Sequence, residues 1–268
     1  VHPKHSMITS IGEQHLVTFG SLDNIIKTKF EIADCITDGT VFLNYDNEYI
    51  RSHSTDKRKV TYGIGGGEYD YKGTDISVSR KGTTFTVVHG GESRTFTTKL
   101  LGEHNVQNIV GAIAVANSFG IPFSELVFPV KRLECVPHRM EILDKGSGIT
   151  VIDDAFNSNP AGARAALKTL SGFEGLRILV TPGMVELGER EYQLNKELGE
   201  FAADCCDIAI LIGEKQAPPI REGLLEKGYP EEKIHVAATL NDGLKIAYGE
   251  KAGVPRVILL ENDLPDNY

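Results

Sequence analysis

The sequence has few cysteines and no long apolar run. Its cysteines are Cys35, Cys135, Cys205 and Cys206. They form no CxxC pair, so a structural zinc site is not expected, and adjacent cysteines such as 205 and 206 rarely bridge each other. A reduced cytoplasmic protein is therefore the simplest expectation. No apolar stretch is long enough to cross a membrane, and the amino end carries no signal-peptide pattern.

Basic residues are also scarce. The chain has 28 lysines and arginines against 37 aspartates and glutamates, which gives a net charge of -9. Proteins that bind nucleic acids rely on lysine and arginine at phosphates, so an acidic chain without basic blocks is not expected to have a nucleic-acid partner. Small anionic ligands stay open, because one arginine can dominate a pocket.

A phosphate-binding loop of the form GxxxxGK[ST] is absent from the sequence. The most suggestive glycine-rich stretch contains Gly63, Gly65, Gly66 and Gly67, which fail the GxGxxG spacing and open no helix. We therefore predict a turn or bulge over these glycines and no phosphate loop.

What is present is an ordinary globular composition. Of the 268 residues, 41% are hydrophobic and 24% are charged, which is enough for one large domain or two medium ones. The pattern of elements changes at Pro137, so we predict two domains, residues 1–136 and residues 137–268.

The first domain is predicted to contain a parallel sheet together with antiparallel hairpins. Between residues 58 and 98 the sequence alternates apolar and polar residues, and glycine-rich turns at 81–82 and 90–91 interrupt it. This pattern is typical of antiparallel hairpins with one wet face. The alternating segments are 60–62, 75–79, 84–88 and 94–97. Apolar patterns predict its other elements, which are strands over 6–12 and 41–44 and helices over 21–33, 105–119 and 124–133. Ser21 and Asp23 suit the start of the first of these helices.

The second domain alternates short apolar strands with helices. This alternation indicates an α/β fold with a parallel sheet covered by helices on both faces, as in Rossmann-like domains. The predicted strands are 150–152, 177–181, 208–213, 234–237 and 257–260, and the predicted helices are 161–170, 189–203, 220–227 and 240–248.

Three polar segments border these apolar elements, namely Gly102–Asn108, Pro137–Glu141 and Asp153–Pro160. Polar residues at the ends of core elements are where α/β proteins usually build ligand sites. Amides suit a base, a carboxylate suits ribose hydroxyls and an arginine suits a phosphate. The three segments together therefore suggest a nucleotide site.

Each segment also has a purely structural interpretation. Asp153 and Asp154 follow a predicted strand and could bind ribose, or one of them could cap the next helix. Asn105 could cap its own helix, or could point its amide at a base together with Asn108. Arg139 could form a salt bridge between the domains or clamp a phosphate.

Two residues near the amino end belong to a fourth group. His15 follows the predicted strand over 6–12 and is a reasonable metal ligand, although a lone histidine is more often an ordinary surface or core residue. Lys29 lies on the next helix, and nothing in the sequence alone distinguishes it from a solvated lysine.

Several ordered motifs resemble the Mur ligases of peptidoglycan synthesis. The run Ile8–Leu16, with Phe19–Ser21 and Lys27–Ile32, is similar to a segment of that family's central domain. The three polar segments and the run Gly183–Gly188 match further family motifs in the expected order, so the resemblance covers nearly the whole chain. It implies a partial central ATPase domain over 1–136, without its phosphate loop, and a Rossmann-like ligase domain over 137–268.

The resemblance also implies roles for individual residues. His15 matches a histidine that binds a catalytic Mg²⁺, and Lys29 matches a lysine that the family carbamoylates, which would turn a cation into a carboxylate able to hold that metal. The implied ATP-binding residues are Asn105 and Asn108 at adenine, Arg139 at the phosphates, Asp154 at ribose, and Asn157 in the segment lining the nucleotide.

The implied reaction is ATP-dependent amide ligation through an acyl phosphate, with UDP-MurNAc-peptide and D-Ala-D-Ala as substrates. The protein is expected to be a monomer that acts in cell-wall biogenesis. Because the family's phosphate loop precedes the segment where this chain begins, we expect an amino-terminally truncated fragment with little activity alone.

The ending Glu261–Tyr268 differs from the KGSR ending of the family members that add D-Ala-D-Ala, which leaves the amino substrate open. Two alternatives therefore stand beside the main hypothesis. One is another Mur-type or folylpolyglutamate-like amide ligase, and the other is a non-catalytic nucleotide-binding or scaffold protein.

Overall fold

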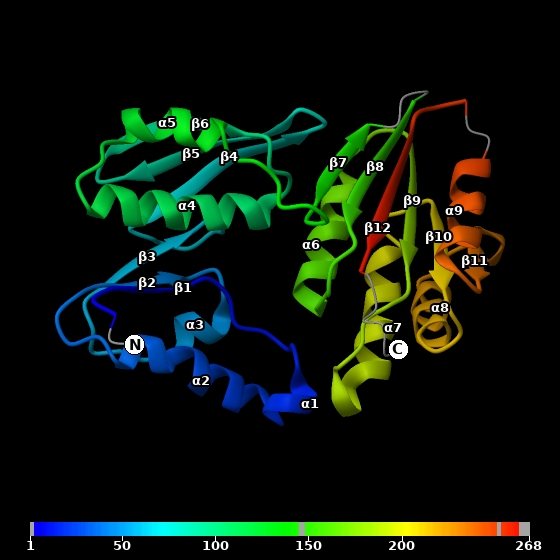
Figure 1. Ribbon diagram of the computed structural model, residues 1–268, viewed down its shortest axis with the longest axis horizontal. Helices are drawn as coiled ribbons and strands as arrows, with labels where there is room; N and C mark the ends of the chain where they lie inside the picture. Colours follow the sequence, from blue (N-terminus) through cyan, green and yellow to red (C-terminus); the bar gives the residue numbers. More distant parts are fainter. Residues whose placement is uncertain (1–2, 145–147, 251–252, 263–268) are drawn as a thin grey trace. The chain divides into compact units, whose positions relative to one another are not determined.

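The structure, a computed structural model, describes residues 3–144, 148–250 and 253–262. Its contacts divide the chain into two units, one formed by Val1–Gly12 with Thr18–Glu134 and the other by Glu13–Val17 with Cys135–Tyr268. Each unit contains a six-stranded sheet with helices, which confirms the predicted α/β fold class (Figure 1).

The sheet of the first unit combines parallel and antiparallel strands. Its first four strands pair in parallel, and the last three pair antiparallel as the two predicted hairpins. The strand order follows the chain: β1 (Ser6–Ile8), β2 (Val41–Asn44), β3 (Lys59–Gly63), β4 (Tyr71–Ser79), β5 (Gly82–His89) and β6 (Glu92–Thr98).

Two predictions for this sheet were wrong. β1 ends at Ile8 and does not reach Gly12, because the backbone carbonyls of Thr9 and Ile11 accept hydrogen bonds from the side chains of Asn44 and Asn47, at 2.8 and 2.7 Å. β3 is parallel to both of its neighbours and does not form a hairpin. The short helix α3 (Glu48–Ser52) supplies the crossover that makes β3 parallel to β2.

The glycine-rich stretch after β3 forms a turn, as predicted. The carboxylate of Asp46 accepts hydrogen bonds from the backbone N–H groups of Ile64 and Gly65, and from the hydroxyl of Tyr69 and the amide of Gln107. These bonds lower the pKa of Asp46, although its burial opposes them. A side-chain anion thus occupies the N–H groups that a phosphate loop would offer to its ligand.

Helices pack on the parallel strands of the first unit, with α4 (Glu103–Ser118) and α2 (Leu22–Asp34) on opposite faces (Figure 1). The hydroxyl of Ser21 caps α2 by accepting a hydrogen bond from Asn24 N–H, as its sequence predicted. α4 contributes Val106, Val110 and Ile113 to a core that contains large aromatic side chains of the sheet. The remaining helices are α1 (Leu16–Phe19) and α5 (Phe123–Lys131), and the aromatic core residues are Phe42, Tyr62, Tyr71, Phe85, Phe96 and Phe123.

The sheet of the second unit is parallel except at one edge. Its strands are β7 (Glu141–Asp144), β8 (Ile149–Asp154), β9 (Leu176–Thr181), β10 (Ile208–Ile212), β11 (Ile234–Ala237) and β12 (Arg256–Glu261), in the order β11-β10-β9-β12-β8-β7. β7 is antiparallel to β8. The wholly parallel sheet predicted from the sequence is therefore corrected at β7, whose four residues are too short and polar to stand out as a strand.

Four helices cover this sheet, namely α6 (Pro160–Ser171), α7 (Glu191–Ala202), α8 (Ala217–Glu226) and α9 (Leu240–Gly249). α8 begins earlier than predicted, because Pro218 and Pro219 suit the first turn of a helix. α7 and α8 approach each other closely at two glycines. A Cβ atom on Gly199 would lie 2.1 Å from the carbonyl oxygen of Ile220, and one on Gly223 would lie 2.0 Å from that of Lys196.

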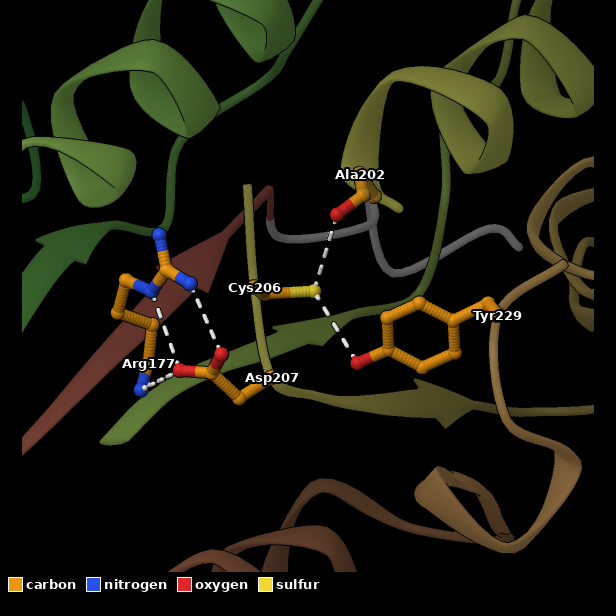
Figure 2. A network of polar contacts seen from close by, with 5 residues as sticks. All are labelled: Arg177, Ala202, Cys206, Asp207 and Tyr229. Carbon is orange, nitrogen blue, oxygen red and sulfur yellow. Dashed lines mark hydrogen bonds and ion pairs between the residues drawn. The ribbon is translucent and has the colours of Figure 1, made fainter. Parts of the chain in front are cut away.

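A polar cluster connects the amino-terminal ends of β9 and β10 (Figure 2). The guanidinium of Arg177 donates two hydrogen bonds to the carboxylate of Asp207, at 2.8 and 3.1 Å. Next to this pair, the buried thiol of Cys206 lies 3.7 Å from the Tyr229 hydroxyl, and burial raises the pKa of the thiol to about 12. A thiol that stays protonated is unreactive, so this cluster is structural.

Among the residues that the structure describes, no helix is both long and apolar enough to span a membrane.

Candidate functional site

The carboxyl ends of β8, β9 and β12 lie next to one another in the second unit. In open α/β sheets, ligands bind outside the carboxyl ends of the strands where the strand order reverses. Here β8 leads to β9, and β12 returns between them, so the order reverses at this place. Asp153 and Asp154 are the last two residues of β8, and neither caps α6, whose cap is Asn159.

The segment 137–141 is held against the end of β8 by both aspartates. His138 Nδ1 lies 2.9 Å from Asp153 Oδ2, and the backbone N–H of Met140 donates to Asp154 Oδ1 at 3.0 Å. His138 and Met140 have positive φ angles of 61° and 52°. Such angles are uncommon for residues other than glycine, so these hydrogen bonds determine the course of the turn that carries Arg139.

Arg139 is exposed at the tip of this turn. Its guanidinium carbon lies 3.9 Å from the centroid of the Phe156 ring, which is a cation–π contact. Burial raises the pKa of Asp154, while the Met140 N–H and the charge of Arg139 oppose that rise. Arg139 and Asp154 together supply a fixed cation next to a carboxylate, which suits the phosphate and the ribose of a nucleotide.

A pocket of about 200 Å³ opens beside Arg139. It brings together three of the residues predicted from the sequence, namely Arg139, Asn157 and His15. Its walls are the loop after β8 and the loop after β9, and its lining residues are Gln14, His15, Arg139, Phe156, Asn157, Ser158, Asn159, Val185, Glu186 and Leu187.

The buried side-chain amide of Asn195 holds the loop after β9. Asn195 on α7 accepts a hydrogen bond from Met184 N–H and donates one to Met184 O, both at 2.9 Å. Gly183 has a φ of 80°, and a Cβ atom there would lie 2.7 Å from Asn195 Oδ1. The close amide and the backbone angle together require glycine at this position.

His15 belongs to the second unit by its contacts. Its Nδ1 lies 2.8 Å from Glu186 Oε2, and its side chain is 45% exposed. Histidines that bind metals usually direct the other ring nitrogen at a carboxylate, so this contact leaves Nε2 for a ligand. Glu186 lies in the run Gly183–Gly188, but no role for it was predicted from the sequence.

Lys29 belongs to the first unit. Its ammonium donates a hydrogen bond to the carbonyl oxygen of Ser10 at 3.1 Å, and burial lowers the pKa of the amine. A lowered pKa increases the share of neutral amine, which is the form that reacts with CO₂. This burial could not be predicted from the sequence, because Lys27 is the same residue type on the same helix and is exposed.

Asn105 and Asn108 also belong to the first unit, on α4. The helix begins at Glu103 after Gly102, so the interpretation of Asn105 as its cap was wrong. Asn105 lies in the first turn and donates its amide to the carbonyl oxygen of Leu101 at 2.8 Å. Asn108 is exposed three residues further on, on the same side of the helix.

The residues expected to bind a nucleotide thus divide between the two units. Arg139, Asp154 and Asn157 belong to the second unit, and Asn105 and Asn108 to the first. Within residues 3–144, 148–250 and 253–262, no group of three or more His, Cys, Asp or Glu side chains is arranged to hold a metal ion. The donor pair of His15 and Glu186 fits Mg²⁺ only in part, since that ion keeps waters and phosphate oxygens as its other ligands.

A mostly parallel sheet with an arginine and a carboxylate at the carboxyl end of a strand is typical of nucleotide-binding α/β proteins. Comparison with known families agrees. The Mur ligase middle domain matches residues 1–116, and the Mur ligase, glutamate ligase domain matches residues 138–261. The chain belongs to the Mur ligase family, whose members are ATP-dependent amide ligases.

Among curated proteins, the UDP-N-acetylmuramoyl-tripeptide–D-alanyl-D-alanine ligase of Bacillus subtilis (strain 168) is 34% identical over 236 residues, which cover 87% of this chain and 50% of that protein. The crystal structure of MurF from Acinetobacter baumannii matches with a TM-score of 0.84 and 25% identity, over 97% of this chain and 56% of that one.

MurF ligase from Thermotoga maritima in complex with ADP has the same fold, with a TM-score of 0.84 and 21% identity over 97% of this chain and 58% of that one. The chain thus spans about half the length of the curated relatives it matches.

Proposed function

We propose that this chain forms part of an ATP-dependent amide ligase that joins D-Ala-D-Ala to UDP-MurNAc-tripeptide during peptidoglycan precursor synthesis. The observation that carries the proposal is the pocket of the second unit, which both Arg139 and Asn157 line. The Asp154 carboxylate does not line this pocket but lies close enough to Arg139 for the charge of that arginine to oppose the rise in its pKa. The relatives at up to 34% identity support the choice of substrates, since the first of them is a ligase for these two compounds by name.

In this proposal each predicted residue has a separate task. Arg139 binds a nucleotide phosphate, and Phe156 restricts its guanidinium so that little conformational freedom is lost on binding. The Asp154 carboxylate accepts hydrogen bonds from ribose hydroxyls, and Asn157 contacts the nucleotide from the loop after β8. The first unit contributes Asn105 and Asn108, whose amides recognise the adenine edge.

The metal-binding residues proposed are His15 and the carbamate of Lys29. Mg²⁺ would supply positive charge that offsets the charge developing on the transferred phosphoryl group. Glu186 orients the His15 ring, and the neutral amine of Lys29 captures CO₂. Among the described residues these two donors have no further carboxylate or histidine grouped with them into a metal site, so phosphate oxygens of the nucleotide and waters would complete the coordination of the ion.

We further propose that residues 1–136 are part of the central ATP-binding domain, that residues 137–268 are the ligase domain, and that the protein is a monomer. The matched ranges 1–116 and 138–261 support this division. All four cysteines are free, which supports a reducing compartment such as the cytoplasm.

The activity is tested by phosphate release in the presence of ATP, Mg²⁺ and UDP-MurNAc-tripeptide, with D-Ala-D-Ala, L-alanine or L-glutamate as the amine. A longer protein that joins this chain to a GxxxxGK[ST] loop should turn over with D-Ala-D-Ala. The 268-residue chain, which has no GxxxxGK[ST] loop, should turn over little or not at all. Preference for another amine would favour a different Mur-type or folylpolyglutamate-like ligase, and the absence of turnover with any amine would contradict the ligase.

A further inference from the structure

The two loops that line the pocket of the second unit come from different strands. The loop after β8 carries Asn157, and the loop after β9 carries Glu186. In the sheet β12 lies between β8 and β9, so the carboxyl end of β12 lies between the starts of the two loops. The residues at the end of β12 are therefore the place where the two loops can be connected.

Glu261, the last residue of β12, makes this connection with its carboxylate. Its Oε1 accepts a hydrogen bond from the Ser158 hydroxyl at 2.5 Å, and its Oε2 accepts one from the Thr181 hydroxyl at 3.1 Å. Ser158 is in the first loop, and Thr181 is the last residue before the second. The Thr181 oxygen in turn accepts a hydrogen bond from the backbone N–H of Gly183 at 3.0 Å.

Asn262 repeats the connection with its amide. Its Oδ1 accepts a hydrogen bond from the backbone N–H of Ser158 at 2.9 Å, and its Nδ2 donates to the carbonyl oxygen of Gly183 at 2.5 Å. It has a φ of 68°, an angle at which most side chains are strained. Two adjacent side chains thus bridge the same two loops.

Burying the Glu261 carboxyl lowers the stability of the fold, and packing alone does not explain why a carboxyl is found at this position. Glu261 is completely buried, and burial with the nearby charge of Asp154 raises the pKa of its carboxyl to about 7. A carboxyl group buried at the end of an apolar strand lowers stability relative to an apolar residue of similar size. Local costs of this kind are usually found at functional sites.

We propose that Glu261 and Asn262 are positioning residues, which hold the loops 155–159 and 182–187 at the separation that the ligand of the pocket requires. That the ligand is an adenine nucleotide rests on the function proposed above, whereas the bridge between the loops does not. Glu261 and Asn262 act through Ser158, Thr181 and Gly183, and they are not expected to touch the ligand.

Amide hydrogen exchange of the 268-residue chain tests the bridge without any ligand. Glu261→Leu removes both hydrogen bonds of the carboxylate, whereas Glu261→Gln keeps an acceptor for Ser158 and offers a donor to Thr181. Glu226→Gln, on the exposed surface of α8, is the matched control. In Glu261→Leu each loop loses one hydrogen bond, so we expect amide exchange in both loops to become about tenfold faster. In Glu261→Gln and Glu226→Gln the exchange rates should stay within about twofold of wild type.

Two single-sided variants keep the test decisive if Glu261→Leu fails to fold. Ser158→Ala should accelerate exchange in the loop 155–159 alone, and Thr181→Val in the loop 182–187. Unchanged exchange in these loops, or equal acceleration throughout the second unit, would show that Glu261 has only a general structural role and would overturn the proposal.

Titration with ADP then tests the positioning. If the wild-type chain binds ADP, its affinity should fall about tenfold in Glu261→Leu and be largely retained in Glu261→Gln. Faster amide exchange in the two loops with unchanged ADP affinity would overturn the positioning role. If the wild-type chain binds no ADP, the proposed nucleotide site fails, while the exchange measurements still decide whether Glu261 connects the loops.

Discussion

The guanidinium of Arg139 lies against the ring of Phe156, with 3.9 Å between its central carbon and the ring centroid. Both side chains are exposed, so this contact is made at the surface of the second unit and not in its core. The aromatic face restricts the arginine while leaving its N–H groups available to an anion. A cation held in this way, beside the carboxylate of Asp154, is the group that we propose binds a nucleotide phosphate in this acidic chain.

The role of Asp154 predicts a preference for nucleotides with ribose hydroxyls. In Asp154→Asn, a charge-assisted hydrogen bond to those hydroxyls is lost, so the preference of the chain for ADP over 2′,3′-dideoxy-ADP should fall about tenfold or more. Calorimetric titration of the two nucleotides measures the ratio. Asp204→Asn, at an exposed position, is the control and should leave it unchanged. If the ratio of the two affinities is unaltered in Asp154→Asn, the Asp154 carboxylate does not bind ribose and only holds the turn through Met140 N–H.

Glu261 predicts a pH dependence of stability. Because its pKa is raised to about 7 in the folded chain, the native state binds more protons than the unfolded state at pH values above the ordinary glutamate pKa. The contribution of Glu261 to stability should therefore be greatest at low pH and decrease as pH rises from about 4.5 to 7, by roughly 3 kcal/mol in total.

Urea unfolding of wild type and Glu261→Gln at several pH values isolates this contribution, since the variant cannot titrate there. The difference in unfolding free energy between the two proteins should change across this interval and be constant above it. A difference that does not vary with pH would mean that Glu261 keeps an ordinary pKa.

The close approach of α7 and α8 predicts that Gly199 tolerates no side chain. Gly199→Ala would place a methyl group 2.1 Å from the carbonyl oxygen of Ile220, so the helices must separate. We expect a loss of about 2 kcal/mol or more, against a small change for Gly249→Ala, where a Cβ atom would have no neighbour within 4 Å. Thermal unfolding of both variants measures the difference, and equal melting temperatures would contradict the packing described.

The burial of Lys29 predicts selective carbamate formation. Its lowered pKa raises the share of neutral amine, so ¹³C-labelled bicarbonate should give a carbamate signal that Lys29→Ala removes. Lys27→Ala, at an exposed position of the same helix, is the control and should retain the signal. In a longer protein that joins this chain to a GxxxxGK[ST] loop, Lys29→Ala should abolish ligation, and short carboxylates should restore part of it. A fully active Lys29→Ala protein would remove this lysine from the mechanism.

Much of the fold could be predicted from local patterns. The cap at Ser21 and the strand Val41–Asn44 were predicted because their signals lie within a few neighbouring residues. The start of α4 was misjudged, since Glu103 begins that helix, Gly102 is its N-cap with a φ of 86°, and Asn105 does not cap it. β7 was missed because it pairs only with β8 and has no apolar pattern of its own.

The site was predicted less completely than the fold. Arg139 and Asp154 could be named as candidates because they lie in polar segments beside apolar strands, and Asn157 because its segment matches a Mur ligase motif. The bridge from Glu261 to Ser158 could not, because its partners are 103 residues apart and meet only when the sheet forms. The pairing of His15 with Glu186 was missed for the same reason.

The central claim is that the second unit binds an adenine nucleotide through Arg139, and calorimetric titration of the 268-residue chain with ADP tests it most directly. We predict saturable binding at one site, weakened about tenfold or more in Arg139→Ala, only partly restored in Arg139→Lys, and unaffected in Arg164→Ala, an exposed arginine paired with Glu197. Absence of binding by the wild-type chain, or equal affinity in Arg139→Ala, would contradict the account.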